Sequence, residues 1–334
     1  MFSLLNKEVK NIIVFDLEWN QSGYNPNHRI PHEIIEIGAC RVDREGHVVS
    51  RFSELIRPRV YKRLDKHIKQ VTGITEEELA NGKPFSDVFG DFIAWCGEDV
   101  QLVTWGRDDY PVLKRNAAFF MTPMPFEPPM DAQLIFGFCC LGGAHQQMNL
   151  HAAMEKMEIE LDAPAHRAVY DAECTAALLG KIDEALCVLP PERRMQLEAT
   201  LEKEKRIAAS ALRSLPTPYM YQTDALADQK FMGLPCPACG KRTAFDTPWF
   251  DSGREKYMAI SVCPQHGFVF GQMHFKRTPS NTLIMHQRAY PASMEDVEDV
   301  RERYRLYQLI PQKKRHHRLN MEDVVNRAVK EKES

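Results

Sequence analysis

The stretch IVFDLEWN, residues 13–20, begins as an apolar strand and ends on two acidic side chains one residue apart. Because residues i and i+2 of a strand share a face, Asp16 and Glu18 are predicted to project together, on the side of Val14 and Ile12. Burying an ionised carboxylate without partners costs several kcal/mol. The pair therefore predicts a cation or a network of donors beside it, and the alternative is a strand that ends in solvent at residue 16.

Composition limits the class of protein. The chain has 334 residues, of which 44% are hydrophobic and 27% charged, as in a soluble globular protein of about two domains. No stretch approaches the roughly 20 consecutive apolar residues that span a bilayer, and the N-terminal MFSLLNKEVK lacks the layout of a secretory signal. We therefore expect a cytoplasmic protein without a membrane partner. The net charge of −3 does not indicate a nucleic-acid binder, but basic residues gather in 51–70 and 313–318, either as polyanion contacts or as solvated faces.

The order of strand-like and helix-like segments predicts an α/β domain over residues 1–188. Segments rich in Ile and Val lie at 11–19, 32–43 and 47–58, a fourth strand is expected at 99–106, and helical patterns alternate with and follow these strands. Beyond this domain we expect a charged helical connector at 189–231, a small domain of short aromatic and polar segments at 232–290, and a helical, partly basic C-terminal tail at 291–334.

Two later segments place further polar side chains where helices begin. TWGRDDY, residues 104–110, puts acids directly after a strand, at the edge where open α/β sheets keep their sites. HRAVYDA, residues 166–172, supplies His166 before a helix and Asp171 in its first turn. If these groups converge with the pair in the first strand, four carboxylates would balance two Mg²⁺ ions, which prefer oxygen ligands.

The segments DLE, WGRDD and HRAVYD resemble the three motifs of the DEDDh 3′–5′ exonucleases, the DnaQ-like superfamily with a ribonuclease H-like fold. The resemblance covers about residues 10–185 and includes EIIEIGA, VTGIT at 71–75 and DAQL, and the TWG lead-in is most similar to the branch of ERI-type RNA exonucleases and a sporulation-pathway inhibitor. It implies an α/β domain with a mixed five-stranded sheet flanked by helices.

The resemblance also implies roles for single residues. Asp16, Glu18, Asp109 and Asp171 would hold two catalytic Mg²⁺ or Mn²⁺ ions, and His166 would act as the general base that takes a proton from the attacking water. In the second motif, Asp108 remains a rival to Asp109, one residue away.

Two residues depart from the pattern of many relatives. Trp19 and Asn20 stand where small or hydroxyl residues are common in the family. We expect them to contact substrate, with Trp19 stacking on the terminal base, because aromatic faces bind bases with little regard to sequence. A tryptophan of the core or of a strand edge is the alternative.

Cysteines cluster in the second half of the chain. CPACG at 236–240 and CPQHG at 263–267 share the form C-P-x-[C/H]-G, in which a tight turn directs two ligands inward. Cys236, Cys239, Cys263 and His266 therefore predict one structural Zn²⁺ in a small zinc-ribbon domain, since all four tetrahedral positions are filled by protein. His274 is a substitute ligand that lacks the turn.

The function expected from the sequence is metal-dependent 3′–5′ exonuclease activity. Such an enzyme would release nucleoside monophosphates from the 3′ end of single-stranded RNA or DNA by two-metal hydrolysis, while the ribbon holds substrate or a protein partner. The alternative is a non-catalytic nucleic-acid-binding or regulatory protein on a nuclease fold. The sequence does not distinguish RNA from DNA, because discrimination rests on contacts to the 2′ position.

Overall fold

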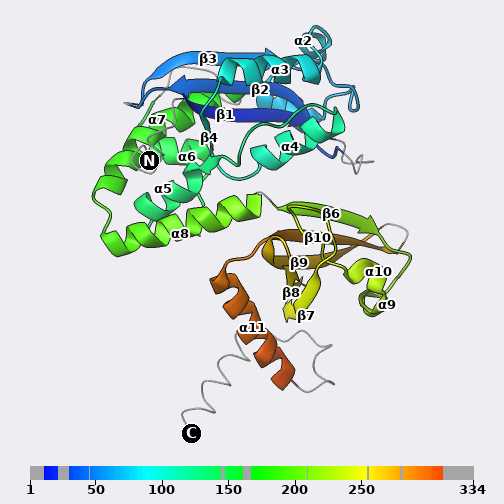
Figure 1. Ribbon diagram of the computed structural model, residues 1–334. Helices are drawn as coiled ribbons and strands as arrows, with labels where there is room; N and C mark the ends of the chain where they lie inside the picture. The colour runs from blue at the N-terminus through cyan, green and yellow to red at the C-terminus, as the bar shows by residue number, and fades with distance from the viewer. Residues whose placement is uncertain are drawn as a thin grey trace. The chain divides into compact units, whose positions relative to one another are not determined.

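The computed structural model describes residues 11–21, 30–44, 46–143, 147–160, 167–208, 210–253, 256–278 and 281–310. The chain divides into two compact units, Met1–Ala208 and Ala209–Ser334 (Figure 1). The division lies inside segment 189–231, which the sequence assigns to a connector. Helix α8 (Pro191–Ala208) packs on the first unit through Leu197, and strand β6 (Ala211–Pro216) belongs to the sheet of the second.

A mixed five-stranded sheet forms the centre of the first unit, in the order β3-β2-β1-β4-β5. Strand β1 (Asn11–Asn20) pairs antiparallel with β2 (Glu33–Val42), and β2 pairs antiparallel with β3 (Val48–Leu55). Strand β4 (Val100–Thr104) runs parallel to β1, and the short β5 (Met130–Asp131) runs parallel to β4. The prediction of an α/β domain built on a mixed five-stranded sheet is therefore confirmed.

The alternation of side chains along β1 creates two apolar layers, one on each face of the sheet. Ile12 and Val14 lie in a core completed by helices α5 to α8, whereas Ile13 and Phe15 pack on the opposite face with α3 and α4. Asp16 and Glu18 continue the first of these series, so they point toward the layer of α7. The other helices are α1 (Lys66–Thr72), α2 (Glu76–Ala80), α3 (Phe85–Cys96), α4 (Asp109–Phe119), α5 (Ala132–Cys140), α6 (Leu150–Lys156) and α7 (Ala168–Cys187).

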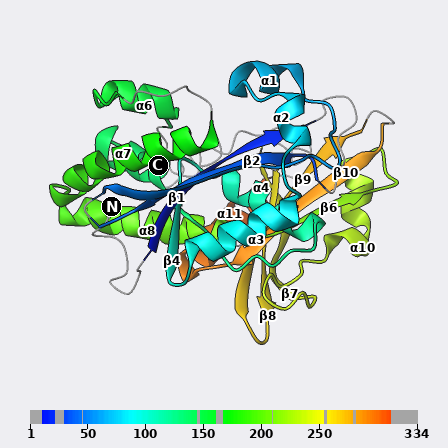
Figure 2. The same ribbon diagram turned by 90° about the horizontal axis from the view of Figure 1, so that it is seen from above.

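The second unit is built on an antiparallel sheet in the order β6-β10-β9-β8-β7, seen from another direction in Figure 2. Met273 and Met285 lie on one face, in a core with Ala225 of α9. Helix α11 packs on the opposite face, where Phe250 contacts Tyr304 and Tyr307. The remaining elements are β7 (Ala244–Gly253), β8 (Lys256–Cys263), β9 (Gly267–Arg277), β10 (Leu283–Pro291), α9 (Gln222–Ala227), α10 (Gln229–Met232) and α11 (Met294–Leu309).

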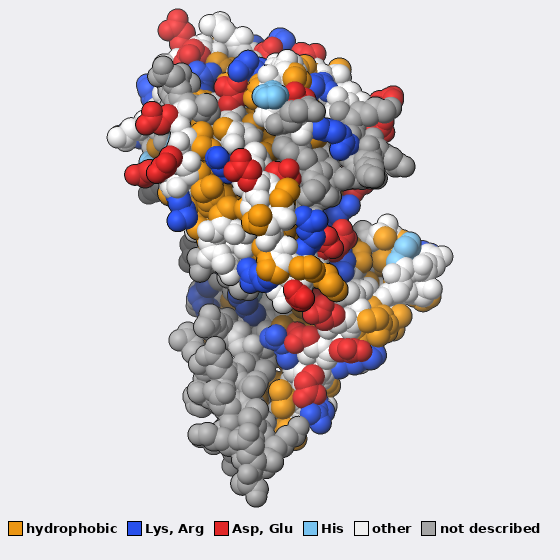
Figure 3. All heavy atoms as spheres, turned by 90° about the vertical axis from the view of Figure 1, so that its left-hand side faces the viewer, with side chains coloured by type: hydrophobic (Ala, Val, Ile, Leu, Met, Phe, Trp, Pro, Cys, Tyr) orange, Lys and Arg blue, Asp and Glu red, His pale blue; other side chains and the backbone are white. Residues whose placement is uncertain are grey.

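The surface carries charges of both signs. On the face drawn in Figure 3, basic and acidic side chains are interspersed with hydrophobic ones, in keeping with the small net charge of −3.

Of the expected C-terminal tail, α11 is helical, and the basic run 313–318 lies outside the described residues. None of the helices in the described ranges is long and apolar enough to cross a membrane.

Candidate active site and a cysteine–histidine cluster

Three carboxylates from distant parts of the chain converge beside the sheet. Asp16 and Glu18 come from β1, and Asp171 comes from the first turn of α7; each offers a carboxylate oxygen within 4.8 Å of the others. Oxygen donors of this kind are the ligands that Mg²⁺ and Mn²⁺ prefer. The donor set therefore fits a hard divalent cation.

Asp109 lies next to this group, whereas Asp108 does not. The Asp109 side chain is 6% exposed in the first turn of α4, and its Oδ1 accepts a hydrogen bond of 3.2 Å from the backbone N–H of Leu17. Leu17 stands between the two acidic residues of β1, so this bond holds Asp109 at the strand that carries them. Asp108 is the exposed N-cap residue of α4. Of the two rivals in the second motif, Asp109 is the one that the fold brings to the cluster.

The electrostatics of the site favour a bound cation. Burial, reinforced by the negative charges of Asp109, Asp171, Glu18 and Glu36, raises the pKa of Asp16 well above its ordinary value. Burial and the same kind of repulsion raise the pKa of Glu18 to about 8, and burial raises that of Asp109 to about 7. A divalent cation among these oxygens would offset both the desolvation and the repulsion, because an opposite charge stabilises the ionised form.

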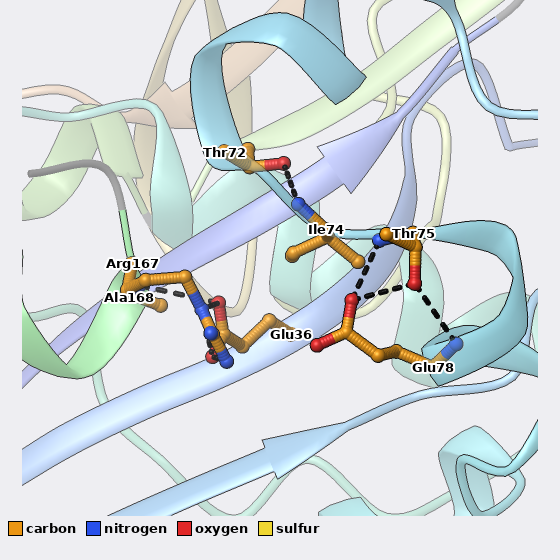
Figure 4. Close-up of polar contacts among 7 residues, drawn as sticks. All are labelled: Glu36, Thr72, Ile74, Thr75, Glu78, Arg167 and Ala168. Carbon is orange, nitrogen blue, oxygen red and sulfur yellow. Dashed lines mark hydrogen bonds and ion pairs between the residues drawn. The ribbon is translucent and has the colours of Figure 1, made fainter. Parts of the chain in front are cut away.

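A buried ion pair fixes the start of α7 beside the carboxylates. The carboxylate of Glu36 is fully buried, and Glu36 on β2 pairs directly with Glu18 on the neighbouring strand β1. It accepts hydrogen bonds from the guanidinium of Arg167, at 2.7 Å from Nη2 and 3.1 Å from Nε, and from the backbone N–H of Ala168 at 3.3 Å (Figure 4). Since Arg167 is the N-cap residue of α7, the pair ties the helix that carries Asp171 to β2.

The segment VTGIT lies beside this ion pair. Thr75 caps α2 in a capping box with Glu78, as shown next to Glu36 and Arg167 in Figure 4. The Arg167 guanidinium and the Glu78 carboxylate are close enough to interact electrostatically. The loop at 71–75 therefore borders the candidate site, as expected for a family motif.

The histidines near the site differ in how far the structure defines them. His166, the expected general base, lies outside the described residues, directly before Arg167. His151 of α6 was not singled out from the sequence; its Nε2 lies 3.8 Å from Oδ1 of Asp171. Its neighbours Leu150, Ala153 and Met154 are buried, and in sequence a histidine within such a helical pattern resembles any other surface position.

Trp19 packs on the face of the sheet opposite the carboxylates, and Asn20 is buried against the loop before α1. Trp19 packs on the side of α3 and α4, with its ring 5.8 Å from that of His32. Asn20 is fully buried, donates from Nδ2 to the backbone carbonyls of Tyr61 and Arg63, and accepts through Oδ1 from the N–H of Asp65. These bonds shape the loop before α1. The expected substrate contacts of both residues stay a prediction.

In the second unit, the predicted zinc ligands come together. The Sγ atom of Cys239 lies 3.9 Å from that of Cys263, and Nδ1 of His266 lies 3.6 Å from Sγ of Cys236 and 3.5 Å from Sγ of Cys263. A tetrahedral Zn²⁺ with ordinary bond lengths requires S–S edges of about 3.8 Å and S–N edges of about 3.6 Å. The cluster therefore has the dimensions of a Cys₃His zinc site.

The turns that carry these ligands explain the two glycines in the pattern. Gly240 and Gly267 adopt φ angles of 69° and 77°, which favour glycine. Hydrogen bonds, of which that from the backbone N–H of Gln265 has the largest effect, lower the pKa of Cys263 to about 6. This favours the thiolate form, which is the form that binds metal. His274, the alternative ligand, instead stacks on His286 at a centroid distance of 4.9 Å.

Comparisons with known proteins agree with the site in the first unit. The model of the RNase T family, described as an exonuclease family, matches residues 13–179. The probable 3′–5′ exonuclease KapD of Bacillus subtilis is 34% identical over 125 residues, which are 36% of this chain and 58% of KapD. The PolC-type DNA polymerase III of the same organism is 29% identical over 178 residues, 52% of this chain and 12% of the polymerase. The chain thus spans little more than half of KapD and a small part of the polymerase.

Solved structures of nucleases are also similar to the chain. The nuclease domain of 3′hExo, a DEDDh family member bound to rAMP, aligns with a TM-score of 0.49 and 20% identity, covering 56% of this chain and 98% of that domain. Escherichia coli Exonuclease I in complex with a dA16 oligonucleotide aligns with a TM-score of 0.46 and 14% identity, covering 75% of this chain and 55% of the other.

Proposed function

Because the chain belongs to the RNase T family of exonucleases, and residues 13–179 are a DEDDh, DnaQ-like exonuclease domain, we propose that the protein is a metal-dependent 3′–5′ exonuclease. It would release nucleoside monophosphates from the 3′ end of single-stranded nucleic acid. The observation that carries the proposal is the convergence of Asp16, Glu18 and Asp171, with Asp109 bound to the same strand. We place it nearest the ERI-type and sporulation-inhibitor branch, on the TWG sequence before the second motif.

The residues of the first unit would divide the chemistry as follows. The four carboxylates would hold two Mg²⁺ or Mn²⁺ ions, which when bound supply Lewis-acid stabilisation and an activated water. His166 would accept the proton of the attacking water, because an imidazole with a pKa near 6.5 takes protons at neutral pH. The ion pair of Arg167 with Glu36 would position His166 and Asp171, because it fixes the residue after His166 and the helix that carries Asp171.

The Cys₃His cluster would hold one structural Zn²⁺. Protein atoms would fill all four tetrahedral positions of such an ion, which would leave no coordination site for a substrate. In this role the metal joins the turn before β7 to the turn between β8 and β9. The second unit would then help to hold substrate or a protein partner.

The test uses strands of identical sequence as RNA and as DNA, labelled at the 5′ end. With Mg²⁺ or Mn²⁺ we expect a ladder that shortens from the 3′ end, and none with chelator; comparison of the two strands identifies the polymer. Asp109→Asn and Asp171→Asn should reduce cleavage to the chelator level, whereas Asp108→Asn is the matched control and should cleave like wild type, because Asp108 is an exposed N-cap. Absence of metal-dependent shortening for both polymers would refute the proposal in favour of a non-catalytic binding protein.

A further inference from the structure

One face of the second sheet gathers basic side chains and two histidines. Side chains alternate across a strand, and Lys256, His274, Lys276, His286 and Arg288 all fall on the same face of β8, β9 and β10. We call these five residues the cationic face. The opposite face of the same strands is the apolar core around Met273 and Met285.

The centre of the cationic face is a row of paired residues across four strands. Lys256 pairs with His274, His274 with His286, and His286 with Ser214. The two imidazole rings stack with an interplanar angle of 22°, and Nδ1 of His286 lies 2.9 Å from Oγ of Ser214. The row therefore presents an ordered π surface flanked by a long basic side chain.

Among the described residues, the charge of this face has no acidic partner. Strands β6, β8, β9 and β10 contain no Asp or Glu. Within the described ranges, no carboxylate forms an ion pair with Lys256, Lys276 or Arg288. Burial, together with the positive charges of Lys256, Arg288 and Lys276, lowers the pKa of His274, in keeping with its place among these three cations.

The neighbouring parts of the sheet are already covered within the second unit. Helices α9 and α10 pack on the core face through Ala225 and Met232. Helix α11 covers the other end of the cationic side of the sheet, where Arg301 lies over the ring of Phe268. Lys256, His274 and Lys276 stay exposed. An exposed set of like charges lowers the stability of the fold, because the charges repel one another. The same charges attract polyanions.

We propose that the cationic face binds the sugar–phosphate backbone of a single-stranded nucleic acid. The proposal rests on the proposed function, since it gives the second unit the task of holding the strand that the first unit shortens. Long basic side chains on three adjacent strands can contact successive phosphates, and stacked imidazoles accept a base on their exposed edge or face. An acidic protein segment would use the charges but not the rings, so the nucleic acid is the ligand that both features fit.

The binding test removes the charges without cutting the ligand. Fluorescence anisotropy with 5′-labelled RNA and DNA strands is measured on full-length Asp16→Asn protein, in which cleavage is expected to be blocked, with and without Lys256→Gln, Lys276→Gln and Arg288→Gln. Loss of three phosphate contacts should weaken binding about tenfold or more and flatten the slope of log K against log salt by about 2, at about 0.7 for each contact with a single strand. The RNA and DNA arms show which polymer is bound more tightly.

A matched control separates the face from the overall charge. Lys230→Gln, Arg303→Gln and Arg305→Gln remove the same charge from α10 and α11, and should leave affinity and slope unchanged. Lys276→Glu alone, at an exposed position, gives a second test should the triple variant fail to fold by circular dichroism. The proposal would be overturned if the face variant bound the strands like wild type, or if the control variant lost as much affinity. It would also be overturned if the face variant lost binding to poly-glutamate but kept its binding to both strands. Because no cleavage is measured, the result does not depend on whether the protein is an exonuclease.

Discussion

Gly38 is the position where a single methyl group should disturb the site most. It lies on β2 opposite Asp16, at the point where the start of α7 crosses the sheet. A Cβ atom added there would stand 1.9 Å from the backbone nitrogen of Val169 and 2.1 Å from the carbonyl carbon of Ala168. These are backbone atoms of the first turn of α7, so no side chain can rotate to make room.

The size of the effect follows from that distance. Cβ atoms are essentially never found closer than 3.0 Å to such an atom, so Gly38→Ala must separate α7 from β2 by more than about 1 Å. Overpacking of this kind costs about 1–3 kcal/mol, or about 2–12 °C in Tm for a unit of about 200 residues. The same displacement moves Asp171 away from Asp16, and a misplacement of about 1 Å lowers kcat by about 100-fold.

The assay compares Tm and the rate of metal-dependent strand shortening with those of wild type. Gly180→Ala is the matched control, because it adds the same methyl group to α7 at a place where nothing lies within 4 Å. It should keep full activity and gain up to about 1 kcal/mol of stability, since alanine favours helix. Wild-type activity in Gly38→Ala would refute the argument that close approach of α7 to β2 assembles the site.

Three further predictions concern the metals and the ion pair. Burial raises the pKa of Glu18 from 4.5 to about 8 and that of Asp109 from 3.8 to about 7, so the metal-free fold loses stability as pH rises from about 4 to about 8. Mg²⁺ should therefore raise Tm more at about pH 8.5 than at about pH 6, and equal increments at the two pH values would contradict this. Arg167→Met leaves the buried Glu36 carboxylate without its cation and should lower the free energy of unfolding, measured by chemical denaturation, by about 3 kcal/mol. Adding Glu36→Gln should restore part of this stability, and a double variant no more stable than the single one would contradict the prediction. Cys239→Ser should lower the zinc content below about one ion per chain, and it should lower the Tm of the second unit but not that of the first. If mass spectrometry shows that the variant retains its zinc, this cluster is not the zinc site.

The parts of the site that follow local rules could be predicted from the sequence. The alternation of IVFDLEWN predicts that Asp16 and Glu18 share a face, and the fold places both in the layer of α7. The capping box at Thr75 and the glycine turns at 240 and 267 also depend on nearby residues only. Family motifs added the distant partner Asp171, which periodicity alone could not bring to the strand.

Features that depend on how elements cross could not be predicted in the same way. Glu36 lies in EIIEIG, a strand buried along nearly its whole length, and its partner Arg167 is 131 residues away. Only the position of α7 over β2 brings the two together. The division at Ala208 also depends on how elements pack, because α8 is charged overall and contacts the core through a short row that includes Leu197 and Leu201.

The two candidate metal sites differ in how far folding would depend on the metal. The carboxylates lie beside a sheet with extensive apolar layers on both faces, around Val14 on one side and Phe15 on the other, so the first unit has a core without any cation. A cation there relieves repulsion that the fold already tolerates, which suits a metal used in catalysis. The Cys₃His cluster instead lies in turns at the end of a sheet, beside a small apolar group around Leu234 and Val269, where a bound metal would add stability that burial does not supply. A chelator that removes Mg²⁺ should therefore stop cleavage while the first unit stays folded, whereas removal of Zn²⁺ should unfold the turns of the second unit.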